Sequence, residues 1–189
     1  MIAPVFKSLF RKDPVRSQAE TLHDALARQA RAPEFFLAGG APDTAEGRFE
    51  VLAAHMFLAL RRLRREAPAT DRLMRLVQEV FFERLDSALR EMGVGDLVVG
   101  RKIRALAEAF YGRNAAYERA LADGGENLAG AIARNILNDN DATRGEAIAK
   151  YVAAAAAHLD KAPVEDLARA ISELEPMSRA IGKENIHDK

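Results

Sequence analysis

The sequence predicts an all-α protein, a single-domain bundle of about six or seven helices. Apolar residues recur at helical spacing along most of the chain, and no segment alternates between apolar and polar residues as a half-buried strand does. Residues that cap or break helices separate these periodic segments. The chain has 189 residues, of which 49% are hydrophobic. This is enough to bury one core.

Seven segments carry the start signals of helices. The first has Asp13 in the N-cap position and Pro14 at the first helical position, and we expect this helix to end near residue 30. A loop rich in Pro and Gly is predicted over residues 31–43. The other helices are predicted to begin near Ala45, after Thr70 or Asp71, after Asp96, after Gly124 and Gly125, after Asp141, and at Pro163.

Residues 45–66 are predicted to form the central helix, which Pro68 ends. The segment is apolar around much of its circumference, as is typical of a helix buried on several sides. His55 lies inside it, and two interpretations are open. The apolar surroundings favour a hydrogen-bonded, partly buried histidine, and the alternative is a polar point on a groove where an apolar partner docks. The main apolar stripe consists of Phe49, Leu52, Met56, Phe57, Leu60 and Leu63.

The two ends of the chain are predicted to differ from the helical domain, which we place at residues 13–175. Residues 1–12 form a short amphipathic segment with basic residues beside its apolar face, so weak peripheral contact with a membrane through residues 2–12 competes with simple packing on the bundle. Residues 176–189 form a polar tail. No apolar run reaches the length of a membrane span or has the flanks of a secretory signal. We therefore expect a cytoplasmic protein, at most peripheral at the inner face of the membrane.

Charge is balanced overall but uneven along the chain. Residues 61–119 carry 13 Lys and Arg against 9 Asp and Glu, whereas residues 120–189 carry 8 against 12. The basic part either contacts an anionic partner or is matched by the acidic part within the molecule. Four arginines between residues 61 and 65 likewise have either a role within the molecule or a role in binding an anionic partner. They stabilise the C-terminus of their helix, and they could also bind phosphate, lipid headgroups or RNA. The four are Arg61, Arg62, Arg64 and Arg65.

The sequence offers little support for catalysis. The absence of cysteine excludes disulfides and thiolate chemistry. Glycine-rich nucleotide motifs and the HExxH and GxSxG motifs are missing. His23 follows Glu20 at the spacing of one half of a di-iron motif, but the second half is absent. We expect no catalytic residues, no metal and no cofactor.

The segment 89–113 holds four of the chain's twelve glycines. Gly93 is predicted to end a helix in the left-handed conformation, with Val94 making the accompanying apolar contact. Gly95 lets the chain reverse, and Asp96 is predicted to be the N-cap of the next helix. These residues therefore have a structural explanation.

Gly100 and Gly112 need a different explanation, because alanine would be more stable at both helical positions. Each lies beside cations, and Gly112 also lies beside aromatic residues. Two small residues on one helix suggest a surface that a partner's backbone approaches closely. A helix-turn-helix DNA reader is disfavoured, because the chain is neutral overall and lacks a strongly basic recognition helix.

Two segments resemble the signature of the ubiquinol–cytochrome c chaperone family, the bacterial relatives of mitochondrial cytochrome b assembly factors. They are LREMGVGDLVVGRKIRALAEAFYGRNAAY at residues 89–117 and PDTAEGRFEVLAAHMFLALRRLR at residues 42–64. The combination of GVGDL, a later basic pair and FYGR is specific to this family. The family often has lysine at the position of Arg101.

The resemblance implies an all-α, non-enzymatic chaperone that binds newly made cytochrome b and supports assembly of the bc1 complex. In mitochondria such proteins act near the ribosome exit and with a small partner protein. The resemblance also implies that the matching residues form or shape the client surface. With His55, Arg61 and Arg62, the predicted partner-binding residues are Gly93, Gly95, Asp96, Gly100, Arg101, Lys102, Phe110, Tyr111, Gly112 and Arg113.

Two other function classes remain open from the residues alone. A helical module that binds RNA or the ribosome would use the arginines of residues 61–65 together with Arg101, Lys102 and Arg104. An unrecognised enzyme would need a pocket with convergent polar groups. Binding of DNA is not expected.

Overall fold

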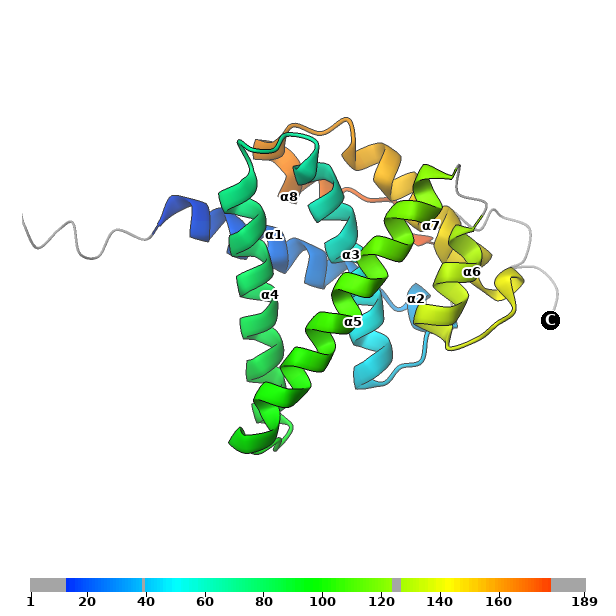
Figure 1. The fold of residues 1–189 in the computed structure, drawn as a ribbon. Coiled ribbons are helices and arrows are strands. Elements are labelled where there is room, and N and C mark those ends of the chain that lie inside the picture. The colour runs from blue at the N-terminus through cyan, green and yellow to red at the C-terminus, as the bar shows by residue number, and fades with distance from the viewer. Residues whose placement is uncertain (1–12, 39, 124–126, 178–189) are drawn as a thin grey trace, which may run out of the picture.

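The computed structural model describes residues 13–38, 40–123 and 127–177. These residues form helices joined by short links, with no strand among them (Figure 1). The predicted all-α fold is confirmed. The predicted amphipathic segment 1–12 and residues 178–189 of the predicted tail lie outside the described residues.

Every predicted helix is present, and one short helix was not predicted. The unpredicted helix, α2, is a single turn inside the segment expected to be a loop. It forms because Phe35 is buried there, with its ring edge-on to the rings of His55 and Tyr151 at centroid distances of 5.2 and 5.0 Å. The α-helices are α1 (Pro14–Gln29), α2 (Glu34–Leu37), α3 (Ala45–Arg64), α4 (Asp71–Glu91), α5 (Asp96–Ala122), α6 (Leu128–Ile132), α7 (Glu146–Leu159) and α8 (Leu167–Ser172).

Tighter and wider helical turns replace parts of three predicted helices. The helix expected to run to about residue 138 is α-helical only in α6 and continues as the π-helical turn Ala133–Leu137, which Asn138 ends with a left-handed φ of 52°. The turns Ala142–Gly145 and Val164–Asp166 are 3₁₀-helical and lead into α7 and α8. Met177, which we assigned to the tail, is buried.

Capping residues begin several helices as expected. Asp13 accepts a hydrogen bond from the Val15 amide at 3.1 Å at the start of α1. Thr44 accepts one from the Gly47 amide at 3.1 Å at the start of α3. Thr70 occupies the N-cap position of α4, but its hydroxyl donates to the Leu63 carbonyl at 2.7 Å instead of capping the helix. This bond ties the start of α4 to the end of α3.

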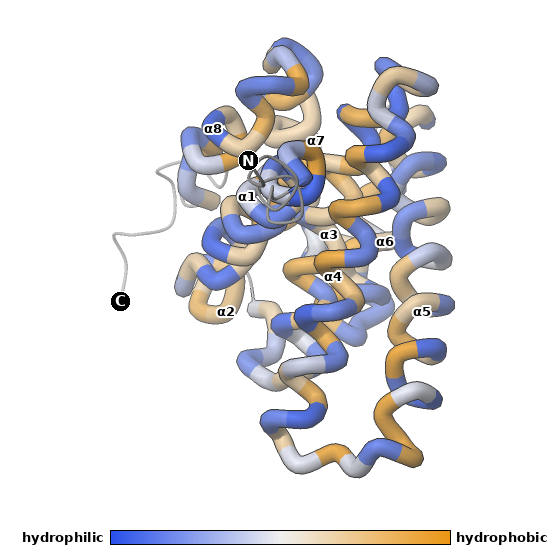
Figure 2. The backbone as a smooth tube through the Cα atoms, turned by 90° about the vertical axis from the view of Figure 1, so that its left-hand side faces the viewer, coloured by the Kyte–Doolittle hydropathy of each residue, from blue (hydrophilic) through white to orange (hydrophobic). Residues whose placement is uncertain are grey.

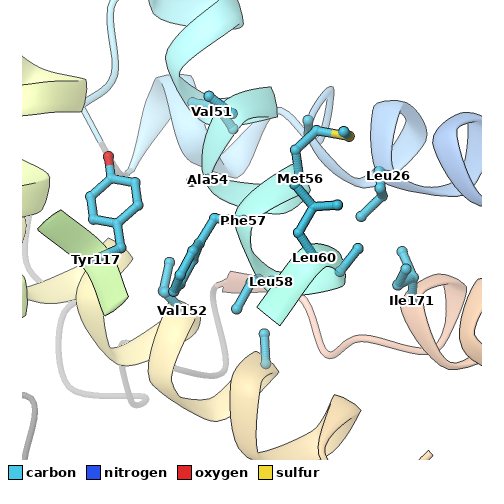
Figure 3. Close-up of a cluster of buried hydrophobic side chains, with 14 of the residues drawn as sticks. Leu26, Val51, Ala54, Met56, Phe57, Leu58, Leu60, Tyr117, Val152 and Ile171 are labelled. Carbon is cyan, nitrogen blue, oxygen red and sulfur yellow. The ribbon is translucent and has the colours of Figure 1, made fainter. Parts of the chain in front are cut away.

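The core is built around α3, in which fourteen of twenty residues are buried. Met56 and Phe57 are fully buried on it. Figure 3 shows side chains from several other helices packed around α3, among them Tyr117 of α5 and Ile171 of α8. The Phe57 and Tyr117 rings meet edge-on at a centroid distance of 5.6 Å. The prediction that this helix is central is therefore confirmed.

Helices α4 and α5 form a hairpin along one side of the molecule. The turn between them lies at one end, beyond the ends of the other helices, in both views (Figures 1 and 2). Helix α1 packs against α4 and α8, and α3 packs against α5 and α7. Among the described residues, no helix combines the length and the hydropathy that a membrane crossing requires.

Candidate functional site

The turn between α4 and α5 has the predicted glycine geometry, with one correction. Gly93 has a φ of 83°, and its amide donates to the Arg90 carbonyl while the Val94 amide donates to the Leu89 carbonyl. This pair of bonds is the Schellman motif, which favours glycine because a Cβ is disfavoured at positive φ. The N-cap of α5 is Gly95 and not Asp96, which we expected in that role. Asp96 is the first helical residue, and its carboxylate accepts a hydrogen bond from Arg90.

Gly100 and Gly112 have open space around them. A Cβ built on either residue would meet no atom within 4 Å. No other part of the described chain therefore requires glycine at these two positions. The close approach of a second backbone occurs instead at Gly47 and Gly145, where a Cβ would lie 1.9 Å from the Pro42 carbonyl oxygen and 2.1 Å from that of Ala129. Sequence reasoning missed both, because their close neighbours are set by tertiary packing.

The aromatic pair of the motif divides between the core and the surface. Phe110 is fully buried and packs against the rings of Phe81 and Phe82. Tyr111 is 55% exposed, and its hydroxyl donates to the Gln78 side chain at 3.2 Å. Phe110 therefore positions α5 and is not accessible to a partner.

His55 lies in the core, which agrees with the first of its two interpretations and contradicts its placement on a docking groove. Its Nδ1 lies 2.8 Å from the Val51 carbonyl oxygen, and its Nε2 lies 2.9 Å from the Tyr151 hydroxyl. Because a carbonyl only accepts, Nδ1 carries the proton and Nε2 accepts from Tyr151. Burial lowers the pKa of His55 to about 4. The side chain is 1% exposed, which removes it from the accessible surface.

The arginines at the end of α3 are matched within the molecule. Arg61 and Arg65 each lie 2.7 Å from a carboxylate oxygen of Asp160, beyond the end of α7. Burial disfavours the Asp160 carboxylate, but the hydrogen bonds from the two arginines outweigh this effect and lower its pKa. Arg64 pairs with Glu118 at 3.2 Å. The two contacts with Asp160 support an intramolecular match between the basic and acidic parts of the chain, whereas Glu118 belongs to the basic part itself.

Arg62 is buried and has a structural role. Its guanidinium donates to the Ala162 carbonyl through Nε at 3.0 Å and through Nη2 at 2.7 Å. Nη2 also donates to Glu66 at 2.5 Å. The predicted partner-binding role of Arg62 is therefore contradicted, because its donors hold the segment after α7 against the end of α3.

A groove of about 630 Å³ opens between α1, α3, α4 and α5. Its lining is mainly apolar, with small alanines on several walls and larger side chains such as Phe49 and Leu106 between them. Most of the lining residues lie in the two segments that carry the resemblance, residues 42–64 and 89–117. The lining residues from these two segments are Ala45, Glu46, Arg48, Phe49, Glu50, Leu52, Leu89, Met92, Lys102, Ala105, Leu106, Ala109 and Arg113.

A nearly buried ion pair lies in the wall of the groove. Arg113 Nη2 donates to Glu50 Oε1 at 2.6 Å, and Arg113 Nε donates to the other carboxylate oxygen. Burial raises the pKa of Glu50, and the Arg113 contacts oppose this in part. A two-point contact of this kind fixes both side chains. It joins α3 to α5 along the groove.

Further cations line the groove. Arg48 pairs with Asp43 at 2.7 Å and lies 5.4 Å from the Phe36 ring centre. Arg31 lies just after the end of α1, and Lys102 lies on α5. Both side chains are exposed. Neither forms an ion pair with another residue of the described ranges. Glu46 also lines the groove, is exposed and forms no ion pair with another described residue, so the groove combines an apolar lining with two cations and one anion that have no ionic partner.

Only two of the predicted partner-binding residues meet at the groove, and these are Lys102 and Arg113. Gly100, Arg101 and Gly112 are exposed elsewhere on α5, and Gly93, Gly95 and Asp96 form the hairpin turn. Sequence reasoning missed the walls from α1 and α4. The helical spacing of Leu85, Leu89 and Met92 indicated one apolar face of α4, but it did not show that part of this face stays uncovered.

The site has the character of a binding surface. Within the described part of the chain, no group of three or more His, Asp or Glu side chains could hold a metal ion. The molecule is an all-α helical protein with an apolar groove that exposed cations flank. The chain belongs to the ubiquinol–cytochrome c chaperone family, whose model matches residues 38–174.

Known proteins of this kind are similar over most of the chain. An assembly factor 1 of the ubiquinol–cytochrome c reductase complex from Xenopus laevis is 25% identical over 84% of this chain and 80% of its own length. The human protein of that name is 23% identical over 84% of this chain and 54% of its own length. A crystal structure described as the Cbp3 homolog from Brucella abortus has a TM-score of 0.76, 30% identity, and coverage of 93% of this chain and 99% of its own.

Proposed function

We propose that the protein is an assembly chaperone of ubiquinol–cytochrome c reductase that binds newly made cytochrome b in the groove between α1, α3, α4 and α5. The observation that carries the proposal is the meeting of the two family-like segments at this groove. One segment lies mainly on α3 and the other mainly on α5, and both contribute residues to the lining of one cavity.

The chemistry of the groove suits a segment of a membrane protein. Before it inserts or assembles, such a segment exposes apolar side chains that need cover from water. The alanine walls allow a helix to approach closely, and larger side chains such as Phe49, Leu89 and Leu106 supply apolar contact area. Arg31 and Lys102 can bind carboxylates or helix C-termini of the client. The protein would act by holding its client and not by catalysis.

The setting of this activity is part of the proposal. The client is made at a membrane, so the chaperone would work at the inner face of the membrane, near the exit of the ribosome. A small partner protein would act with it. The family membership and the similarity to assembly factors of the ubiquinol–cytochrome c reductase complex support this setting.

Deletion of the gene tests the function. We expect lower cytochrome b and lower ubiquinol–cytochrome c reductase activity, with other respiratory complexes unchanged. A tagged chain purified from detergent-solubilised membranes should carry cytochrome b, identified by mass spectrometry. Normal levels of the complex in the deletion strain would contradict the proposal, as would a purified chain without cytochrome b.

A further inference from the structure

The turn between α4 and α5 exposes large apolar side chains at one end of the molecule. Leu97 is 97% exposed and Met92 is 58% exposed. Val94 lies between them in the sequence and Val98 follows Leu97, and both valines are half-buried. Figure 2 shows hydrophobic residues along this turn, which lies away from the centre of the bundle. We call residues 92–98 the hairpin tip.

The backbone of the hairpin tip is held in place. The Schellman bonds at Gly93 close α4, and the Val98 and Val99 amides both donate to the Gly95 carbonyl at the start of α5. Val99 is 2% exposed, so the opposite side of the first turn of α5 is anchored in the protein. Leu97 is therefore presented to the outside by a defined helical turn.

Cations follow the apolar tip along α5. Arg101 comes one helical turn after Leu97, about 6 Å along the axis, and Arg104 comes about one turn later. Arg101, Lys102 and Arg104 are exposed and form no ion pair with the rest of the described chain.

Acidic side chains also occur near the tip. Asp96 and Asp86 both accept hydrogen bonds from Arg90, which offsets part of their charge. Glu91 is exposed and forms no ion pair with another described residue. The three cations on α5 therefore outnumber the one acid at the tip that has no cationic partner.

We propose that the hairpin tip contacts an anionic lipid surface. Leu97 and its apolar neighbours enter the boundary between headgroups and acyl chains, and Arg101, Lys102 and Arg104 lie at the level of the lipid phosphates. The separation of one to two helical turns between leucine and cations matches the depth of 5–10 Å at which interfacial helices lie. Met92 and Lys102 also line the client groove, whereas Leu97, Arg101 and Arg104 do not, so variants of these three residues test the lipid contact separately from the groove.

A lipid surface fits this tip better than a protein partner does. Apolar anchors of protein interfaces are typically surrounded by contacts that exclude water. Leu97 is almost fully exposed, so a protein partner would have to supply most of that surround itself. Lipids adapt to a projecting side chain, and their phosphates pair with cations without a fixed geometry. With so few apolar side chains, the contact is weak and reversible.

Flotation of the full-length chain with lipid vesicles tests the proposal. We expect binding to vesicles of phosphatidylcholine with phosphatidylglycerol, little binding to phosphatidylcholine alone, and weaker binding at high salt. Leu97→Glu should lower the bound fraction strongly. The matched control is Leu37→Glu on α2, because Leu37 is, among the described residues, the other large apolar side chain with more than four-fifths of its surface exposed.

A charge series separates the cations at the tip from cations elsewhere on the same helix. The double variant Arg101→Glu and Arg104→Glu should lower the partition coefficient by roughly tenfold or more. Arg119→Glu is its control, because Arg119 is exposed near the far end of α5. Circular dichroism checks that each variant keeps its helical content.

Two results would overturn the proposal. One is a wild-type chain that does not float with anionic vesicles. The other is a Leu97→Glu chain that floats as well as wild type, and this includes the case in which only removal of residues 2–12 abolishes binding. If such a chain also no longer purified with cytochrome b, the tip would be a protein-docking surface. Loss of flotation with normal recovery of cytochrome b would support the lipid contact and leave the client site intact.

Discussion

The clearest electrostatic constraint at the residue scale is a neutral histidine in the core. His55 donates from Nδ1 to the Val51 carbonyl and accepts at Nε2 from Tyr151, so both ring nitrogens have partners in the neutral imidazole. Its pKa falls from an ordinary 6.5 to about 4 because burial disfavours the charged form. Unfolding exposes the ring and restores its ordinary affinity for protons.

This linkage predicts that acid weakens the protein. Because the folded pKa is depressed, the contribution of His55 is present above about pH 6.5 and is lost as the pH falls toward 4, by a total of about 3 kcal/mol. Burial also lowers the pKa of His23, which adds to the same trend. Urea unfolding of wild type and His55→Asn at several pH values measures the effect. The variant should lose most of the slope between pH 6.5 and 4, while the exposed His158→Asn should keep it. Equal slopes in wild type and His55→Asn would show that His55 does not set this dependence.

At the scale of elements, the α4–α5 hairpin separates two uses of glycine. Gly93 is required by its backbone, since its φ is 83° and it closes α4. Gly100 and Gly112 have ordinary helical surroundings and open space where a Cβ would stand. Gly93 therefore shapes the turn, whereas Gly100 and Gly112 have no side chains and so add no bulk to the surface of α5.

Alanine substitutions distinguish these uses. Gly93→Ala should lower the free energy of unfolding by about 1 kcal/mol, because alanine is disfavoured at positive φ. Gly100→Ala and Gly112→Ala should be neutral or raise it by up to about 1 kcal/mol, since alanine is the better helix former. Chemical denaturation measures all three. If Gly112→Ala folds and still supports normal cytochrome b assembly, the client does not need a residue without a side chain at that position.

At the scale of the whole molecule, the groove exists because four helices leave one face of their bundle uncovered. The floor and walls come from residues separated by up to 86 positions in the sequence, from Ala27 to Arg113. The Glu50–Arg113 ion pair joins two of the helices along it. A change of volume inside the groove should therefore affect a bound client more than it affects the fold.

Filling the groove tests its role. Ala105→Trp and Ala109→Trp each place a large ring among the lining residues, and we expect roughly tenfold less cytochrome b with the purified chain. The control is Ala115→Trp, which adds the same ring at an exposed position of α5 outside the groove. Thermal unfolding confirms that the variants remain folded. Equal recovery of cytochrome b from all three variants would place the client site elsewhere.

The sequence by itself determined the helical fold, most helix boundaries and the turn at Gly93. These features depend on apolar periodicity, capping residues and allowed backbone angles, which act within a few residues. Short helices were less predictable. Helix α2 forms in a segment whose composition indicated a loop, because the burial of Phe35 against two other elements outweighs local propensity.

The tertiary structure alone decided which side chains are accessible. Arg62 and Arg101 have the same chemistry in sequence, yet Arg62 bonds to the Ala162 carbonyl inside the protein while Arg101 is exposed. The groove likewise could not be read from any one helix, because each contributes only part of its wall. Burial, ion pairing and cavities arise between residues far apart in the chain. Their geometry is set by how the helices pack, and a local pattern does not contain it.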